Sequence, residues 1–209
     1  MKKYLVEFIG TFFLVLTVGM TVIDPGSADK LAPLAIGSAL MIMVYAGGHV
    51  SGGHYNPAVT VAVWLRGRCS QADVPGYIGS QIAASIVAAF VVLGLKGDPS
   101  VSSKDIAVFP ALIAELVGTF ALAYVVLNVA TAKGTTGNSY YGLAIGFTVT
   151  AMAFALGSIS LGAFNPAVAV GITVMKLAKV SNLWVYLVAN LGAGALAAYV
   201  FRMVNPEDK

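Results

Sequence analysis

Charged residues are distributed so unevenly along the chain that the gaps between them outline its secondary structure. Residues 31–65, 74–95, 116–132, 134–175 and 180–201 contain no Asp, Glu, Lys or Arg. A helix needs about 20 apolar residues to cross the hydrocarbon core of a bilayer. The gaps of 22, 17 and 22 residues therefore fit one membrane-spanning helix each. The gaps of 35 and 42 residues hold one such helix and a shorter apolar segment.

The order of these segments repeats. Glu7-Phe8-Ile9-Gly10-Thr11-Phe12 recurs as Glu115-Leu116-Val117-Gly118-Thr119-Phe120, at an offset of 108 residues. Leu34-Ala35-Ile36-Gly37 recurs as Leu143-Ala144-Ile145-Gly146, and Asn56-Pro57-Ala58-Val59 as Asn165-Pro166-Ala167-Val168, both at an offset of 109. Collinear blocks at a nearly constant offset indicate an internal duplication. We expect a single membrane domain over residues 1–209, with repeat 1 over residues 1–100 and repeat 2 over residues 105–209.

Each repeat contains three predicted spans, at residues 4–23, 33–50 and 75–95 and at residues 109–132, 140–157 and 182–202. An odd number of crossings makes the second repeat start from the opposite side, so the two repeats are inverted in the membrane. With an internal N-terminus, seven Lys and Arg residues lie inside and five outside, which favours cytoplasmic termini. The inside set is Lys2, Lys3, Arg66, Arg68, Lys133, Arg202 and Lys209. We expect an integral, multi-pass protein of the cell (inner) membrane.

The surplus apolar residues form two short segments, residues 56–65 and 165–175, that each begin with Asn-Pro-Ala. About ten residues make a helix of about 15 Å, half the thickness of the hydrocarbon core. Asn before the first turn and Pro within it are preferred at helix N-termini. Gly-rich residues 47–55 and 157–164 precede them, and we expect these stretches to be non-helical. The sequence thus predicts six transmembrane helices and two re-entrant half-helices.

Inversion brings the half-helices in from opposite faces, so that their N-termini meet near the membrane midplane. The amides of Asn56 and Asn165 then supply donors at the centre, while the extended stretches supply carbonyl acceptors along a narrow path. Two positive helix-dipole ends repel protons and cations at that point. This combination is typical of a pore for neutral polar solutes.

The paired boxes Asn56-Pro57-Ala58 and Asn165-Pro166-Ala167, with the two Glu-x-x-Gly-Thr-Phe segments, resemble the major intrinsic proteins, the aquaporins and glycerol facilitators. The resemblance covers essentially the whole chain. It implies a pore in each subunit of a homotetramer. It also implies that Glu7, Glu115, Gln81 and Asn190 brace the re-entrant loops, and that seven further loop residues line the pore. These are Gly52, Gly53, His54, Tyr55, Leu161, Ala163 and Phe164.

The selectivity filter departs from the family pattern. Most relatives carry an Arg after the second box, and here that position is Val168. Counting back from the Asn residues along the family pattern places the other filter positions at Ile36, Ala153 and Gly162. Small or aliphatic side chains in place of aromatics and a guanidinium predict a wider and less polar filter. We expect water and small neutral solutes such as glycerol, urea and ammonia to pass, without strict selectivity for water.

Composition narrows the alternatives. The chain is 58% hydrophobic and 10% charged, and its net charge of +3 is scattered, which disfavours nucleic acid as a partner and leaves lipid. We expect no catalytic residues and no cofactor, because no nucleophile, acid–base pair or metal cluster lies in the spans. We expect no metal site at His49 and His54, because no Cys, Asp or Glu lies near them in the sequence. The lone Cys69 excludes an internal disulfide.

A secondary transporter with an ion-coupling carboxylate remains open, although Glu7 and Glu115 lie near their span ends. A structural membrane protein with a vestigial pore also remains open.

Overall fold

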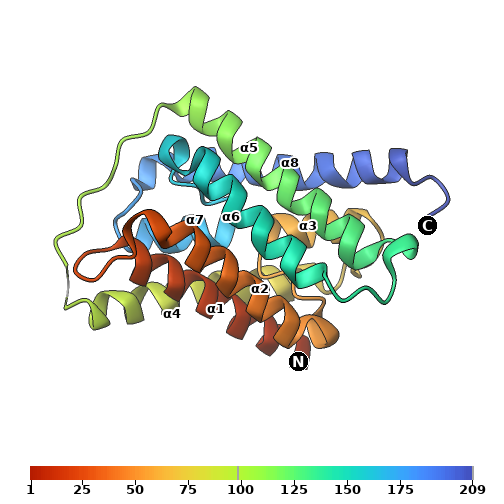
Figure 1. The fold of residues 1–209 in the computed structure, drawn as a ribbon. Coiled ribbons are helices and arrows are strands. Elements are labelled where there is room, and N and C mark those ends of the chain that lie inside the picture. The colour runs from red at the N-terminus through yellow and green to blue at the C-terminus, as the bar shows by residue number, and fades with distance from the viewer. Residues whose placement is uncertain (98, 209) are drawn as a thin grey trace.

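The computed structural model describes residues 1–97 and 99–208, and within them the chain is helical (Figure 1). The long helices are α1 (Lys2–Val22), α2 (Ala32–Ser51), α4 (Val74–Leu95), α5 (Val108–Val126), α6 (Tyr141–Ser160) and α8 (Leu183–Val204). The short helices are α3 (Pro57–Leu65) and α7 (Pro166–Val174). A π-helical turn, Leu127–Thr131, extends α5. Six helices of the described chain are long and apolar enough to span a membrane, which confirms the six predicted spans.

The helices before the two re-entrant loops are longer than predicted. We expected non-helical backbone from residues 47 and 157, and this is wrong, because α2 continues to Ser51 and α6 to Ser160. Glycine inside a helix costs only about 1 kcal/mol. At Gly47 it is required by packing, because a Cβ there would lie 2.2 Å from the hydroxyl oxygen of Tyr55. The non-helical loops are therefore short, covering residues 52–56 and 161–165.

The two repeats pack in the same way. Helix α1 contacts α2 and α4, and its counterpart α5 contacts α6 and α8. Helices α2 and α6 join the repeats, and they approach closely at Gly37 and Gly146, where an added Cβ would lie 2.5 Å from the carbonyl oxygen of the other glycine. Each half-helix packs against the third span of the opposite repeat, α3 against α8 and α7 against α4. This exchange holds the two half-helices in the centre of the bundle.

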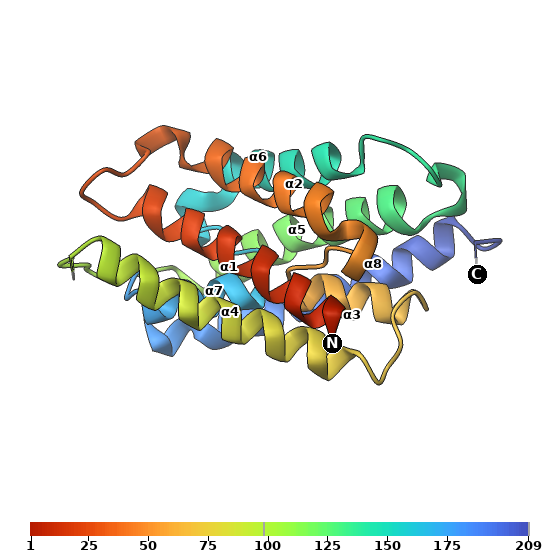
Figure 2. The ribbon, with the colours of Figure 1, turned by 90° about the horizontal axis from the view of Figure 1, so that it is seen from below.

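Both termini lie toward the same end of the bundle, as Figures 1 and 2 show. Ion pairs tie this end together. Lys3 pairs with Asp73 at 2.6 Å, and Arg66 pairs with Asp208 at 2.6 Å. At the opposite end, the backbone of Lys104 donates to the carbonyl of Leu177, which attaches the loop between α4 and α5 to the end of α7. Of the cytoplasmic residues expected above, Lys209 lies outside the described residues.

Candidate pore and selectivity filter

Each half-helix begins with an asparagine that caps it. The side-chain Oδ1 of Asn56 accepts hydrogen bonds from the backbone N–H groups of Ala58 at 2.8 Å and Val59 at 3.4 Å. Asn165 repeats this with Ala167 at 2.8 Å and Val168 at 3.4 Å. These bonds satisfy orphan donors at the helix N-terminus. They also fix the orientation of both side-chain amides.

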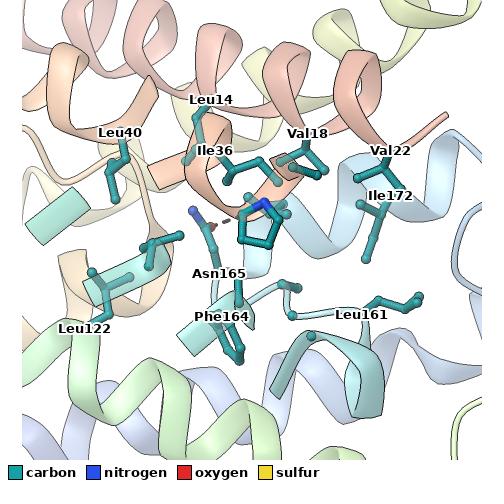
Figure 3. Close-up of a pocket in the computed structure, with 18 of the residues that line it drawn as sticks. Leu14, Val18, Val22, Ile36, Leu40, Leu122, Leu161, Phe164, Asn165 and Ile172 are labelled. Atoms are coloured by element: carbon teal, nitrogen blue, oxygen red, sulfur yellow. Dashed lines mark hydrogen bonds between the residues drawn. The ribbon is translucent and has the colours of Figure 1, made fainter. Parts of the chain in front are cut away.

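The fixed amides link the two loops across the centre of the bundle. Asn56 donates from Nδ2 to the carbonyl of Phe164 at 2.9 Å, and Asn165 donates to the carbonyl of Tyr55 at 2.9 Å. An amide nitrogen carries two N–H donors. One donor of each asparagine is used in this link. The second is available to a solute, because both residues line the same cavity (Figure 3).

A buried carboxylate binds the backbone of the first loop. Glu7 of α1 is fully buried and accepts four hydrogen bonds. Two come from the backbone N–H groups of His54 at 3.0 Å and Tyr55 at 2.6 Å. The others come from Ser51 Oγ at 2.7 Å and Gln81 Nε2 at 2.8 Å. The carboxylate thus approaches the residue before Asn56 more closely than its position in the span indicated.

Glu115 of α5 binds the second loop in the same way. It accepts from Ser160 Oγ at 2.7 Å and from the backbone N–H groups of Ala163 at 2.9 Å and Phe164 at 2.7 Å. The hydrogen-bond network orients the Asn190 amide so that its nitrogen donates to Glu115 at 3.0 Å and its oxygen accepts from the backbone of Asn165 at 2.9 Å. Both carboxylates are sealed from solvent, and neither belongs to the cavity lining.

The carboxylates use the loop donors and leave the loop acceptors unused. Within the part of the chain that the structure describes, no protein donor reaches six loop carbonyls, those of Gly52, Gly53, His54, Leu161, Gly162 and Ala163. Buried carbonyls are rarely left without a partner. Five of these residues, all except Gly53, border one of the cavities described below, so their carbonyls are available as acceptors there.

The main cavity has a volume of about 570 Å³ and runs from the end of the bundle opposite the termini to the asparagine pair. All four predicted filter residues line it, namely Ile36, Ala153, Gly162 and Val168. Most of the remaining lining is aliphatic, with Leu14, Val18, Leu40, Leu122 and Ile172 among the labelled side chains of Figure 3. Charged residues line the cavity only near its mouth, where the structure describes Asp29, Lys30 and Lys104.

A second cavity of about 480 Å³ opens at the end that carries the termini. Its lining is more polar and includes Ser51, Gly52, Arg68 and Asp73. His54 lines both cavities and therefore lies between them. The His54 ring is held in place, because Nδ1 lies 3.1 Å from Thr60 Oγ1. Its centroid also lies 4.8 Å from that of the Tyr77 ring.

The seven loop residues predicted to line the pore do not all border these two cavities. Gly53 and Tyr55 border neither cavity. The Tyr55 ring is buried against α1, where an added Cβ on Gly10 would lie 2.1 Å from its Cε1 atom. The Phe164 ring packs on Gly118 in the same way, at 2.3 Å, and points away from Asn165 in Figure 3. Phe164 still borders the main cavity, as do Leu161 and Ala163.

Sequence reasoning missed two tyrosines that support the loops. Tyr77 donates its hydroxyl to the carbonyl of Ser51 at 2.6 Å, and Tyr186 donates to the carbonyl of Ser160 at 2.8 Å. Each bond satisfies a carbonyl at the end of the helix that precedes a loop. The 109-residue offset relates Tyr77 to Tyr186 and Ser51 to Ser160, so this repeat is the signal that identifies them. Among residues 1–97 and 99–208 there is no cluster of side chains suited to a metal ion.

Comparison with known proteins gives a consistent result. The family model described as major intrinsic protein matches residues 1–201. The chain is 36% identical to "Glycerol uptake facilitator protein-like 6" of Lactiplantibacillus plantarum, with all of both chains covered. It is 32% identical to "Aquaporin NIP1-2" of Arabidopsis thaliana, covering all of this chain and 76% of that protein. An aquaglyceroporin structure from Plasmodium falciparum has the same fold, with a TM-score of 0.82 at 21% identity, over 98% of this chain and 97% of that one.

Proposed function

The chain belongs to the major intrinsic protein family, and we propose that its channel conducts glycerol, urea and ammonia as well as water. It is an integral, multi-pass membrane protein and a passive channel, not an enzyme. The observation that carries the proposal is the filter. Ile36, Ala153, Gly162 and Val168 border one cavity and offer neither a charge nor an aromatic ring.

The filter sets which hydrogen bonds a solute can make. An Arg at the position of Val168 would offer five N–H donors. Without it, the second loop contributes the carbonyls of residues 161–163 beside the filter, and carbonyls are acceptors. A solute with several O–H or N–H donors recovers part of the hydration that it loses on entry. Water, glycerol, urea and ammonia all carry such donors.

Charge exclusion then falls on the centre of the pore. Two half-helix N-termini and two asparagine amides face the same region, which gives it a positive potential. A water molecule there accepts from the free N–H of Asn56 or Asn165, which orients its own protons away from the centre. This arrangement opposes cations and interrupts a proton wire, even though the outer guanidinium is missing.

We assign Glu7, Glu115, Gln81 and Asn190 to bracing the loops. The geometry supports this role, because both carboxylates bind loop N–H groups and lie outside the cavity lining. A carboxylate that couples an ion would need access from the cavity. The same geometry therefore disfavours the transporter alternative.

We further propose cytoplasmic termini, insertion in the cell membrane and assembly as a homotetramer with one pore per subunit. The orientation is supported by Lys3, Arg66, Arg68 and Lys133, which lie at the end that carries both termini. Proteolysis of sealed vesicles of known orientation tests the topology. Native mass spectrometry of the detergent-solubilised protein tests the tetramer.

The solute proposal is tested by reconstitution in liposomes. Stopped-flow light scattering follows shrinkage under an osmotic gradient of sucrose, glycerol or urea, with protein-free liposomes as the control. We expect rapid water efflux in every case, followed by re-swelling as glycerol or urea enters. Water flow with retention of glycerol and urea would refute the wide filter. Saturable, ion-dependent flux would indicate a carrier, and permeability equal to that of bare lipid would indicate a vestigial pore.

A further inference from the structure

The residue that begins the second re-entrant loop has a backbone conformation that suits glycine. Leu161 has φ of +72°, in the left-handed region. The 109-residue offset relates it to Gly52, which begins the first loop with φ of +89°. A residue with a Cβ is disfavoured in this conformation. Repeat 2 therefore has a leucine at a position where repeat 1 has a glycine, although the backbone conformation is the same.

The position two residues further along each loop differs in the opposite sense, with a large side chain in the first loop and a small one in the second. In the first loop, an added Cβ on Gly52 would lie 3.2 Å from Nε2 of His54. The counterpart of His54 in the second loop is Ala163, whose short side chain leaves that space free. Each loop thus carries one large side chain in this pair of positions. It is the imidazole of His54 in the first loop and the isobutyl group of Leu161 in the second.

The leucine side chain lies at the cavity. Leu161 borders the main cavity and is half-buried against the apolar core. In Figure 3 its side chain lies toward the same end of the cavity as Val22 and Ile172. A strained backbone does not by itself mark a functional position, because Lys176 also has a positive φ where its counterpart is Gly67, and Lys176 borders neither cavity. Strain held at a ligand path is the combination that points to function.

We propose that Leu161 is a specificity-determining residue of the channel. Its side chain sets the size limit on the outer side of the pore, where Ile36, Ala153, Gly162 and Val168 leave the filter wide. It is an apolar restriction, so it slows a bulky polyol more than water. This inference rests on the proposed channel function and adds a fifth residue to the filter.

Two substitutions separate the side chain from the backbone strain. Leu161→Gly and Leu161→Ala both remove the isobutyl group, but only glycine relieves the left-handed conformation. In reconstituted liposomes, we expect both variants to raise the ratio of glycerol to water permeability several-fold. We also expect both to admit the larger polyol erythritol faster than the wild type. In detergent, the Leu161→Gly protein should unfold at a higher temperature than the Leu161→Ala protein.

Two controls distinguish a local effect from a general one. Leu161→Met keeps the volume of the side chain, and Leu143→Ala removes a side chain that is 46% exposed on the outer surface of α6. Leu143→Ala should retain the wild-type ratio, and Leu161→Met should raise the ratio less than Leu161→Gly or Leu161→Ala does. If the wild type conducts but Leu161→Gly and Leu161→Ala leave the ratio unchanged, the role of Leu161 is overturned while the channel stands. If the wild type itself conducts neither water nor solutes, the proposed function fails instead.

Discussion

Glu7 accepts four hydrogen bonds, two of them from the loop backbone, although it lies in a membrane-spanning helix. An ionisable residue inside a membrane is costly unless it is paired or hydrogen-bonded. Here its partners supply donors to both oxygens, so the carboxylate organises the loop. Repetition of the Glu-x-x-Gly-Thr-Phe block makes the pair Glu7 and Glu115 visible in the sequence. The contacts themselves depend on how far each loop turns back, which no periodicity indicates.

We expect Glu7→Gln to destabilise the protein by about 1–3 kcal/mol, because the glutamine leaves buried loop donors without an acceptor. A glutamine has one oxygen where Glu7 has two, and its NH₂ group would face the N–H of either His54 or Tyr55. Thermal unfolding in detergent, followed by circular dichroism, measures the effect. Glu207→Gln, an exposed change of the same type, is the control. Equal unfolding temperatures for the two variants would contradict the bracing role.

At the level of elements, the half-helices were predictable and the loops before them were not. Asn-Pro-Ala after a full span is a capping signal with a length limit, and α3 and α7 begin at the expected prolines. The helices α2 and α6 extend further than expected, because their glycines serve packing and do not break the helix. Glycine alone does not reveal which of these two roles it has. The ring positions of Tyr55 and Phe164 depend on Gly10 and Gly118 in other helices.

The contact between Gly10 and the Tyr55 ring gives a second prediction. We expect Gly10→Ala to destabilise the protein by about 1–3 kcal/mol, because the added methyl group overlaps the Tyr55 ring and forces a shift of the ring or of α1. Gly79→Ala is the matched control, since an added Cβ there meets no atom within 4 Å. That change should be neutral or stabilising by about 0.5–1 kcal/mol, because alanine favours a helix. Chemical or thermal unfolding compares the two variants. A Gly79→Ala protein that is less stable than the Gly10→Ala protein would contradict the prediction.

At the level of the whole molecule, the duplication fixed most of the architecture in advance. An odd number of spans per repeat required the two copies to be inverted. The copies contact each other through α2 and α6, and each half-helix packs against the third span of the opposite repeat. The ion pairs at the end that carries the termini have no counterpart in the repeat pattern. They join Lys3 to Asp73 and Arg66 to Asp208. Sequence could not indicate them, because their partners are brought together only by the packed bundle.

The Lys3 pair gives a pH prediction. The hydrogen bond from Lys3, with further ones from Ser70 and Tyr4, lowers the pKa of Asp73 from 3.8 to about 2. Because the folded-state pKa of Asp73 lies below its ordinary value, the ionised Asp73 side chain stabilises the folded protein, and this contribution is complete above about pH 4. It is lost as the pH falls toward 2. Unfolding temperatures measured between pH 5 and 2 should fall less steeply for Asp73→Asn than for the wild type, and parallel curves would contradict the prediction.

The central claim is that an aliphatic filter at Val168, in place of a guanidinium, lets small neutral solutes pass with water. The direct measurement is the ratio of glycerol to water permeability for the wild type and Val168→Arg in matched liposomes. We predict that the arginine narrows the filter and lowers glycerol flux more than water flux, so that the ratio falls. A ratio that stays the same in the two proteins would contradict the claim.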